Sequence, residues 1–325
     1  MKKIIDDSRL MIKVCDLYYN ENKNQQQIAN ILNISYPTVS HLLSGAVEQN
    51  IVNITISNLD MVKYWDLEQQ VKKIFKLRDV VIVDSSAECP DVKQKLGNAA
   101  SKYLENILTP GAKVGISMGS TLYHMAYSPI TKNTENITFI PLVGGMGRLR
   151  TELHSNHLAE TLAKKYNSRF VPLYAPARVS NKVVRKELKN ETGVSEVLAL
   201  QKGLSVAVVG IGYPNDNSSI KATGYYKDNE IQSLLEKNVA GEICMQFYDI
   251  SGNTSLYKND NTVIGINLNM LRKIPYSVAV AGGNDKIPAI IGAINGKYIN
   301  VLITDYNCAK GLIKYIKKGE EADEL

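Results

Sequence analysis

The sequence predicts an α/β protein with a small N-terminal helix-turn-helix domain and a large doubly wound domain built on a mostly parallel sheet. Over residues 1–57, apolar residues recur at helical spacing around a short polar break. From residue 79 onward, short apolar runs alternate with helical segments, as in parallel sheets covered by helices on both faces. We therefore expect domains at 1–57 and 79–325, with a linking helix at 58–78.

The composition is that of a globular protein, because 44% of the 325 residues are apolar. The sequence contains no run of 18 apolar residues, so it predicts no membrane span. The N-terminal segment carries acidic residues where a signal peptide needs an apolar core, so we expect a cytoplasmic protein. The cysteines lie too far apart to predict a metal or redox pair; they are Cys15, Cys89, Cys244 and Cys308.

The N-terminal domain is predicted to contain three helices. The first covers 4–20 and the second Gln25–Leu32, with Ile28, Ile31 and Leu32 turned inward. Ser35 is a suitable N-cap for the third helix, and Pro37 suits its first turn. The third helix should run to about Gln49 and bury Val39, Leu42, Leu43 and Val47. The alternating segment 50–57 predicts a strand that closes a small wing.

A helix, a tight turn and a second helix are the plan of a helix-turn-helix, whose second helix presents its N-terminal side chains to the major groove. The side chains predicted to contact DNA are Gln26, Ser35, Tyr36, Thr38, Ser40 and His41. No Arg or Lys lies between Ser35 and Gln49, and residues 1–58 hold five basic and five acidic residues although the whole chain carries +6. The alternative is a helical cap that binds nothing.

The linking helix has a broad apolar stripe that includes Tyr64, the single tryptophan Trp65, Val71, Ile74 and Phe75. Two interpretations remain open. Either the stripe packs on its own large domain, or part of it packs on a second subunit and places two helix-turn-helix domains side by side.

Eight apolar runs in the large domain predict strands, at 80–84, 113–117, 137–143, 170–174, 204–210, 262–266, 276–282 and 299–305. Helical segments lie between most of them, for example at 91–107, 154–166 and 285–295.

Ligands bind beyond the carboxyl ends of the strands in such sheets. Gly119, Ser120 and Thr121 stand between a strand and a helix, where free amides and two hydroxyls can hold an anion. Other predicted strand ends carry Gly144 and Gly145, Gly210 and Gly212, and Gly282 with Lys286 close behind. Together these ends predict a site for a small anionic ligand, although each glycine alone is ordinary turn chemistry, and Lys286 alone an ordinary solvated lysine.

No pattern predicts catalysis or a metal site. His154, His157 and Glu160 follow an i, i+3, i+6 spacing that does not converge on one ion, so we interpret them as polar surface. The enzyme alternative has only loose candidates, Glu242, His124 and Asp249.

The segments "QQQIANILNISYPTVSHLL", "GIGYP", "GEICMQFYDISG" and the long block "VIGINLNMLRKIPYSVAVAGGNDKIPAIIGAINGKYINVLITD" resemble the SorC family of bacterial sugar-responsive transcriptional regulators. That family includes central glycolytic gene regulators and one type of deoxyribonucleoside regulator. The resemblance implies a helix-turn-helix head and an effector domain related to sugar-phosphate isomerases and deaminases. It further implies a phosphorylated sugar as effector, double-stranded operator DNA as partner, and a homo-oligomer, dimer or tetramer.

By the same resemblance, Gly119, Ser120, Thr121 and Lys286 hold phosphate and Glu242 lies near sugar hydroxyls, without any cofactor. The chain departs from the family in lacking an arginine near Tyr36 or His41, and in having Tyr306 where the family has glutamate. The expected function is that of a transcriptional regulator, a repressor more often than an activator, of a carbohydrate or nucleoside catabolic operon. The alternatives are a sugar-phosphate enzyme and an assembly module with a vestigial pocket.

Overall fold

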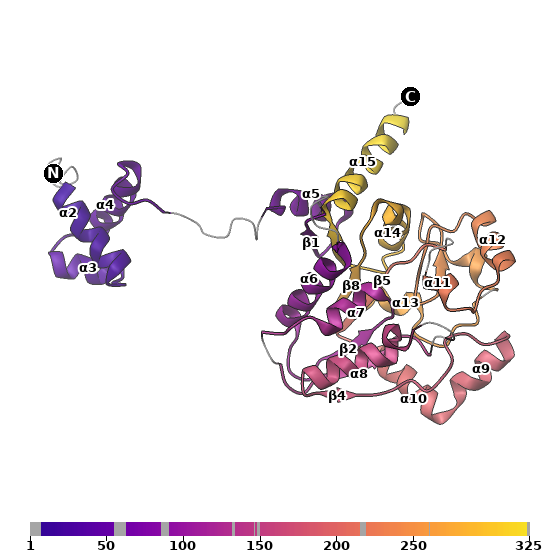
Figure 1. Cartoon of the computed structure of the whole chain (residues 1–325). Coiled ribbons are helices and arrows are strands. Elements are labelled where there is room, and N and C mark those ends of the chain that lie inside the picture. The colour runs from indigo at the N-terminus through magenta and orange to yellow at the C-terminus, as the bar shows by residue number, and fades with distance from the viewer. Residues whose placement is uncertain are drawn as a thin grey trace. The chain divides into compact units, whose positions relative to one another are not determined.

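The computed structural model describes residues 8–54, 63–85, 91–131, 134–145, 147, 150–214, 219–259 and 261–323. The chain divides into two compact units, Met1–Lys63 and Tyr64–Leu325, and Figure 1 traces the elements of both in chain order.

The first unit contains α2 (Ser8–Cys15), which continues as a π-helical turn (η1, Asp16–Asn20), then α3 (Gln25–Leu32) and α4 (Tyr36–Glu48). Asn24 and Gln27 form a capping box at the start of α3, with bonds of 2.9 and 3.0 Å. Asn33 ends α3 in the left-handed conformation. Ser35 caps α4 as predicted, because its hydroxyl accepts the Thr38 amide at 3.3 Å.

The three helices enclose one small core, and its residues are Met11, Val14, Cys15, Ile28, Ala29, Val39, Leu42, Leu43 and Ala46. Two burial predictions were wrong: Ile31 and Val47 are 55% and 41% exposed. On α4, the buried positions 39, 42, 43 and 46 follow one helical face, and Val47 lies one position beyond it. The predicted wing strand is absent from residues 50–54; residues 55–57 lie outside the described part of the chain.

The second unit is built on a seven-stranded sheet in the order β1-β9-β8-β5-β2-β3-β4, and every strand pair in it is parallel. The strands are β1 (Asp79–Val83), β2 (Lys113–Ile116), β3 (Thr138–Pro141), β4 (Arg169–Phe170), β5 (Val206–Gly210), β8 (Tyr276–Val280) and β9 (Val301–Asp305). Each lies within or overlaps a predicted apolar run, so the parallel sheet is confirmed.

Helices cover both faces of this sheet. The helices are α5 (Trp65–Phe75), α6 (Val92–Ile107), α7 (Ser120–Tyr127), α8 (Ser155–Lys165), α9 (Lys182–Asn190), α10 (Thr192–Leu200), α11 (Ser219–Ala222), α12 (Asp228–Glu236), α13 (Leu268–Leu271), α14 (Ile287–Asn295) and α15 (Tyr306–Asp323). Short 3₁₀ turns occur at η3 (Thr151–Leu153), η4 (Gln201–Gly203), η5 (Ser255–Tyr257) and η6 (Asn284–Lys286). Core residues of α6, α7 and α8 pack on one face, and those of α5, α10, α14 and α15 pack on the other.

The predicted strand at 262–266 was wrong. This segment makes only isolated antiparallel bridges, from Val263 to Arg178 and from Gly265 to Val143. Its side chains are apolar because Val263, Ile264 and Ile266 are buried in the core. The sequence analysis also missed a two-stranded hairpin, β6 (Gly241–Ile243) and β7 (Gln246–Tyr248).

The linking helix packs on its own large unit through α5. Val71 is buried, and Glu68 accepts the amide of Ile82 from the edge strand β1 at 2.8 Å. Tyr64 stacks on Tyr306 with ring centroids 5.0 Å apart, which gives the residue that departs from the family pattern a packing role. Trp65 and Ile74 stay 56% and 42% exposed.

Candidate functional site

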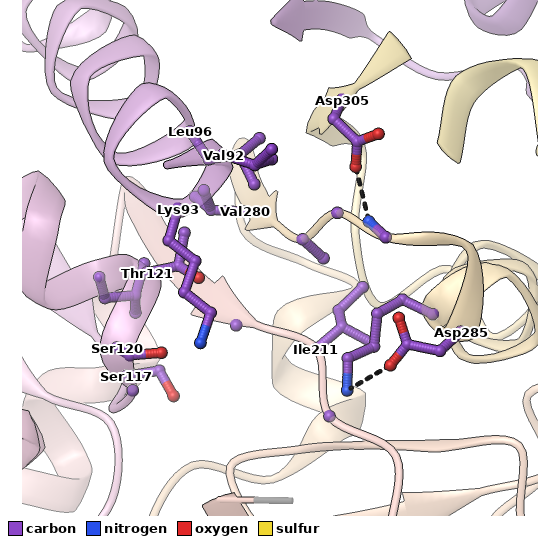
Figure 2. A pocket seen from close by; sticks show the side chains of 18 of the residues that line it. Val92, Lys93, Leu96, Ser117, Ser120, Thr121, Ile211, Val280, Asp285 and Asp305 are labelled. Carbon is purple, nitrogen blue, oxygen red and sulfur yellow. Dashed lines mark hydrogen bonds and ion pairs between the residues drawn. The ribbon is translucent and has the colours of Figure 1, made fainter. Parts of the chain in front are cut away.

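A cavity of about 560 Å³ opens at the carboxyl ends of four adjacent strands, β9, β8, β5 and β2 (Figure 2). The structure brings eight of the ten predicted effector residues to its wall; they are Gly119, Ser120, Thr121, Gly210, Gly212, Glu242, Gly282 and Lys286. Strands far apart in sequence meet here because parallel strands of one sheet end at one edge.

Gly144 and Gly145 do not line the cavity, which corrects the prediction for that strand end. The Leu142 amide still donates to Ile116 of β2, at 2.9 Å. Beyond it the chain bonds elsewhere, since the Gly144 amide donates to Ile264 at 3.1 Å and the Gly145 amide to Ala175 at 2.8 Å. A Cβ on Gly144 would lie 2.4 Å from the Ala175 carbonyl oxygen. These glycines therefore allow close backbone packing rather than ligand binding.

The turn before α7 forms the first wall of the cavity. Gly119 has φ +122°, its amide donates to Leu153 at 3.1 Å, and its carbonyl accepts from Tyr123 at 2.9 Å. Gly119 therefore shapes the turn and its own amide is used. The amides of Ser120 and Thr121 begin the helix, where the first amides have no carbonyl of the same helix to bond. This helix start remains suited to an anion.

Glu242 enters the cavity from β6 and is only 5% exposed. One carboxylate oxygen accepts the Met245 amide at 2.8 Å. The other would lie 2.1 Å from a Cβ on Gly212, so the bare glycine makes room for this carboxyl group. Burial raises the pKa of Glu242 to about 7, and the Met245 hydrogen bond and the Lys286 charge oppose that rise.

The hairpin that carries Glu242 turns at two residues with positive φ, Cys244 at +51° and Met245 at +61°. Hairpin turns of this kind usually carry glycine or asparagine, and other residues cost conformational energy. Because neither residue is glycine or asparagine, this turn carries no signal that could be recognised from the residues alone. The Cys244 sulfur lies 3.2 Å from the Ser117 hydroxyl, so the hairpin tip closes the floor of the cavity.

Asp305 is a cavity residue that the sequence analysis missed. Its two oxygens accept the amides of Gly283 at 2.6 Å and Cys308 at 3.0 Å, and thereby join the ends of β8 and β9. A Cβ on Gly282 would lie 2.4 Å from this carboxylate. The position of Asp305 at the end of an apolar run was a usable signal, because ligand sites form at strand ends.

Lys93, Asn284, Asp285 and Asn307 also line the cavity and were not predicted. Lys93 comes from the first turn of α6, which reaches the rim only through tertiary packing. Lys286 lies 3.7 Å from Asp285 in an ion pair. Neither His124 nor Asp249, the other candidates for an enzyme, lines the cavity. Asp249 accepts hydrogen bonds from Ser251 and Asn253 in a local turn.

Two of the other polar candidates bond to neighbouring side chains on α7 and α8. His157 is hydrogen-bonded to the Tyr127 hydroxyl at 2.9 Å, and Glu160 pairs with Lys164 at 2.7 Å.

In the N-terminal unit, the predicted reading residues occupy one end of α4 and the first turn of α3. Gln26, Ser35, Tyr36 and His41 are exposed, whereas Thr38 and Ser40 are half-buried. The hydroxyls of Ser35 and Thr38 lie 2.7 Å apart, so both take part in the helix cap. Gln26, Tyr36 and His41 are exposed and lie outside this cap, and their contact with DNA stays a prediction.

Comparison with known proteins identifies the chain's relatives. The family model described as "Putative sugar-binding domain" matches residues 60–314. The chain is 31% identical to the sorbitol operon regulator of Klebsiella pneumoniae, across 95% of this chain and 99% of that protein. It is 30% identical to the deoxyribonucleoside regulator of Bacillus subtilis, across 95% and 98%.

The crystal structure of the full-length Klebsiella pneumoniae regulator, SorC, matches with a TM-score of 0.71 over 95% of this chain and 99% of that one. In the described residues, no helix is both long enough and apolar enough to cross a bilayer. The sequence motifs, the parallel-sheet domain and these matches agree: the chain belongs to the SorC family of transcriptional regulators with a sugar-binding domain.

Proposed function

We propose that this protein is a DNA-binding transcriptional repressor of a carbohydrate or nucleoside catabolic operon, controlled by a phosphorylated sugar and without enzymatic activity of its own. The observation that carries the proposal is one chain with a helix-turn-helix head and a polar cavity at the ends of four parallel strands. Relatives named as operon regulators support the same conclusion.

The cavity has the groups that a sugar phosphate requires. The start of α7 offers amides and the hydroxyls of Ser120 and Thr121 to a phosphate. Glu242 and the Lys286–Asp285 pair offer donors and acceptors to sugar hydroxyls. The enzyme candidates His124 and Asp249 lie outside the cavity wall. The other two carboxylates of the wall are engaged, because Asp285 pairs with Lys286 and Asp305 accepts the amides of Gly283 and Cys308.

Regulation follows from linkage in this proposal. The effector binds one arrangement of subunits better than another, and the DNA affinity changes by that difference. Homo-oligomers bring two heads to paired half-sites. The exposed Trp65 and Ile74 on α5 support a contact with a second copy.

The test is DNA binding by the full-length chain to its own upstream promoter fragment at low ionic strength, with and without a panel of sugar phosphates. We expect an effective sugar phosphate to change DNA affinity by roughly 5- to 150-fold. The Ser120→Ala/Thr121→Ala variant should bind DNA normally and lose that response. The His41→Ala variant should bind DNA less tightly and keep its response to the sugar phosphate. No binding of the wild-type chain to the fragment, with or without the metabolites, contradicts the proposal.

A further inference from the structure

Two lysines line the effector cavity from different elements, Lys93 from α6 and Lys286 from η6. The resemblance to the family pointed to Lys286 as the phosphate partner. The surroundings of the two ammonium groups differ, and the difference reverses that assignment.

Lys286 already has an ion-pair partner. Its ammonium lies 3.7 Å from the Asp285 carboxylate. Glu242 is close enough that the Lys286 charge acts on it. A phosphate dianion at this end of the cavity would lie near two carboxyl groups, those of Asp285 and Glu242, and near only one ammonium group, that of Lys286. Repulsion between like charges in a partly buried site opposes its binding there.

Lys93 is in the opposite situation. Among the described residues it has no ion-pair partner, whereas its neighbour on the same helix, Lys95, lies 3.7 Å from Asp84 and bonds the Asp84 carbonyl at 3.3 Å. Figure 2 shows the Lys93 amine extending into the cavity on the side of Ser120 and Thr121. The remaining carboxylate, Asp305, is committed to the amides of Gly283 and Cys308.

Lys93 therefore adds a full positive charge to the wall that already holds the helix amides and two hydroxyls. A phosphate group needs this combination, because charge-assisted bonds from an ammonium and from helix N-terminal amides reinforce each other. Lys93 is exposed, so its long side chain can adjust to the ligand without disturbing the core.

We propose that Lys93, together with the start of α7, binds the phosphate of the effector, and that Lys286 with Asp285 and Glu242 contacts its hydroxyls. The inference rests on the proposed function and fixes the orientation of the ligand. A sugar carrying one phosphate ester enters with that phosphate at the Lys93 wall.

Inorganic phosphate is the probe, since it tests the phosphate subsite without knowledge of the sugar. Thermal unfolding of the full-length chain is measured from 0 to 100 mM phosphate at pH 7, with ionic strength held constant by sodium chloride. The stabilisation yields an apparent Kd for each variant. Far-UV circular dichroism confirms that each variant folds.

Lys93→Met should raise the apparent Kd at least tenfold, while Lys93→Arg should keep it within threefold of wild type. Lys95→Met is the matched control, because it removes the same charge from the same helix outside the cavity wall, and it should change the Kd less than twofold. The Asp285→Asn/Lys286→Met variant removes the ion pair without altering net charge and should change the Kd less than threefold.

A large loss in Asp285→Asn/Lys286→Met with normal binding in Lys93→Met overturns the assignment of Lys93 and leaves the proposed function intact. Equal losses in Lys93→Met and Lys95→Met also overturn it, because they reveal a general effect of charge. Absence of phosphate stabilisation in the wild-type chain refutes both this inference and the anion site on which the proposed function rests.

Discussion

Replacing Glu242 by glutamine should abolish a specific pH dependence of stability. Glu242 is almost completely buried, and burial raises its pKa from the usual 4.5 to about 7. In the unfolded chain the carboxyl group ionises near 4.5. Between these values the folded state holds the proton more tightly, so the stability contributed by this group is present at low pH and falls as pH rises toward 7.

The size of the effect follows from the two pKa values. Each tenfold change in an acid dissociation constant corresponds to about 1.4 kcal/mol, and the linkage relation gives a loss of roughly 2.5 kcal/mol between pH 5 and pH 8. Glutamine has nearly the same shape but does not ionise. Between pH 5 and pH 8, the free energy of unfolding of the Glu242→Gln protein should therefore rise by about that amount relative to that of wild type.

Urea unfolding of the full-length protein at pH 5, 6, 7 and 8, followed by far-UV circular dichroism, measures this difference for the second unit. Glu160→Gln is the control, because Glu160 forms an exposed pair with Lys164 on α8, and such pairs contribute less than about 1 kcal/mol. If wild type and Glu242→Gln lose stability in parallel from pH 5 to 8, the buried carboxyl group is not the cause and the reasoning fails.

Three further predictions concern the head, the cavity wall and the DNA contact. Leu42→Ala opens a cavity in the core of the N-terminal unit, where Leu42 is fully buried, and should destabilise that unit by roughly 2–5 kcal/mol. Gel-shift assays should then show no promoter binding, while the phosphate-induced thermal shift persists. Retained promoter binding would contradict this prediction. Gly282→Ala places a Cβ 2.4 Å from an Asp305 oxygen and should cost about 1–3 kcal/mol in thermal or urea unfolding, whereas Gly193→Ala, with nothing within 4 Å, should cost nothing. Because residues 1–58 carry equal numbers of basic and acidic side chains, the salt dependence of promoter affinity should be shallow, and a slope equivalent to eight or more released ions refutes that expectation.

The sequence by itself determined most of the sheet, since six of its seven strands arise from apolar runs whose side chains are buried in the cores on its two faces. The exception is the edge strand β4, whose Arg169 is exposed and whose Phe170 is half-buried. The sequence also determined the head, where Ser35 and Pro37 mark the start of α4 through purely local chemistry. Eight predicted effector residues also lie on one cavity. Seven of them were predictable because strand ends in a parallel sheet share an edge, a rule that needs no knowledge of strand order. The eighth, Glu242, lies on the hairpin strand β6 and was expected only from the resemblance to the family.

Tertiary structure alone decided the rest, because the deciding contacts join residues distant in sequence. Gly144 and Gly145 looked like strand-end glycines, but their chain turns away to bond Ile264 and Ala175. The space for Glu242 exists only because Gly212 lies opposite it, and the Cys244–Met245 turn carries no local signal. Lys93 reaches the ligand wall because α6 packs beside α7, a proximity that no spacing in the sequence encodes.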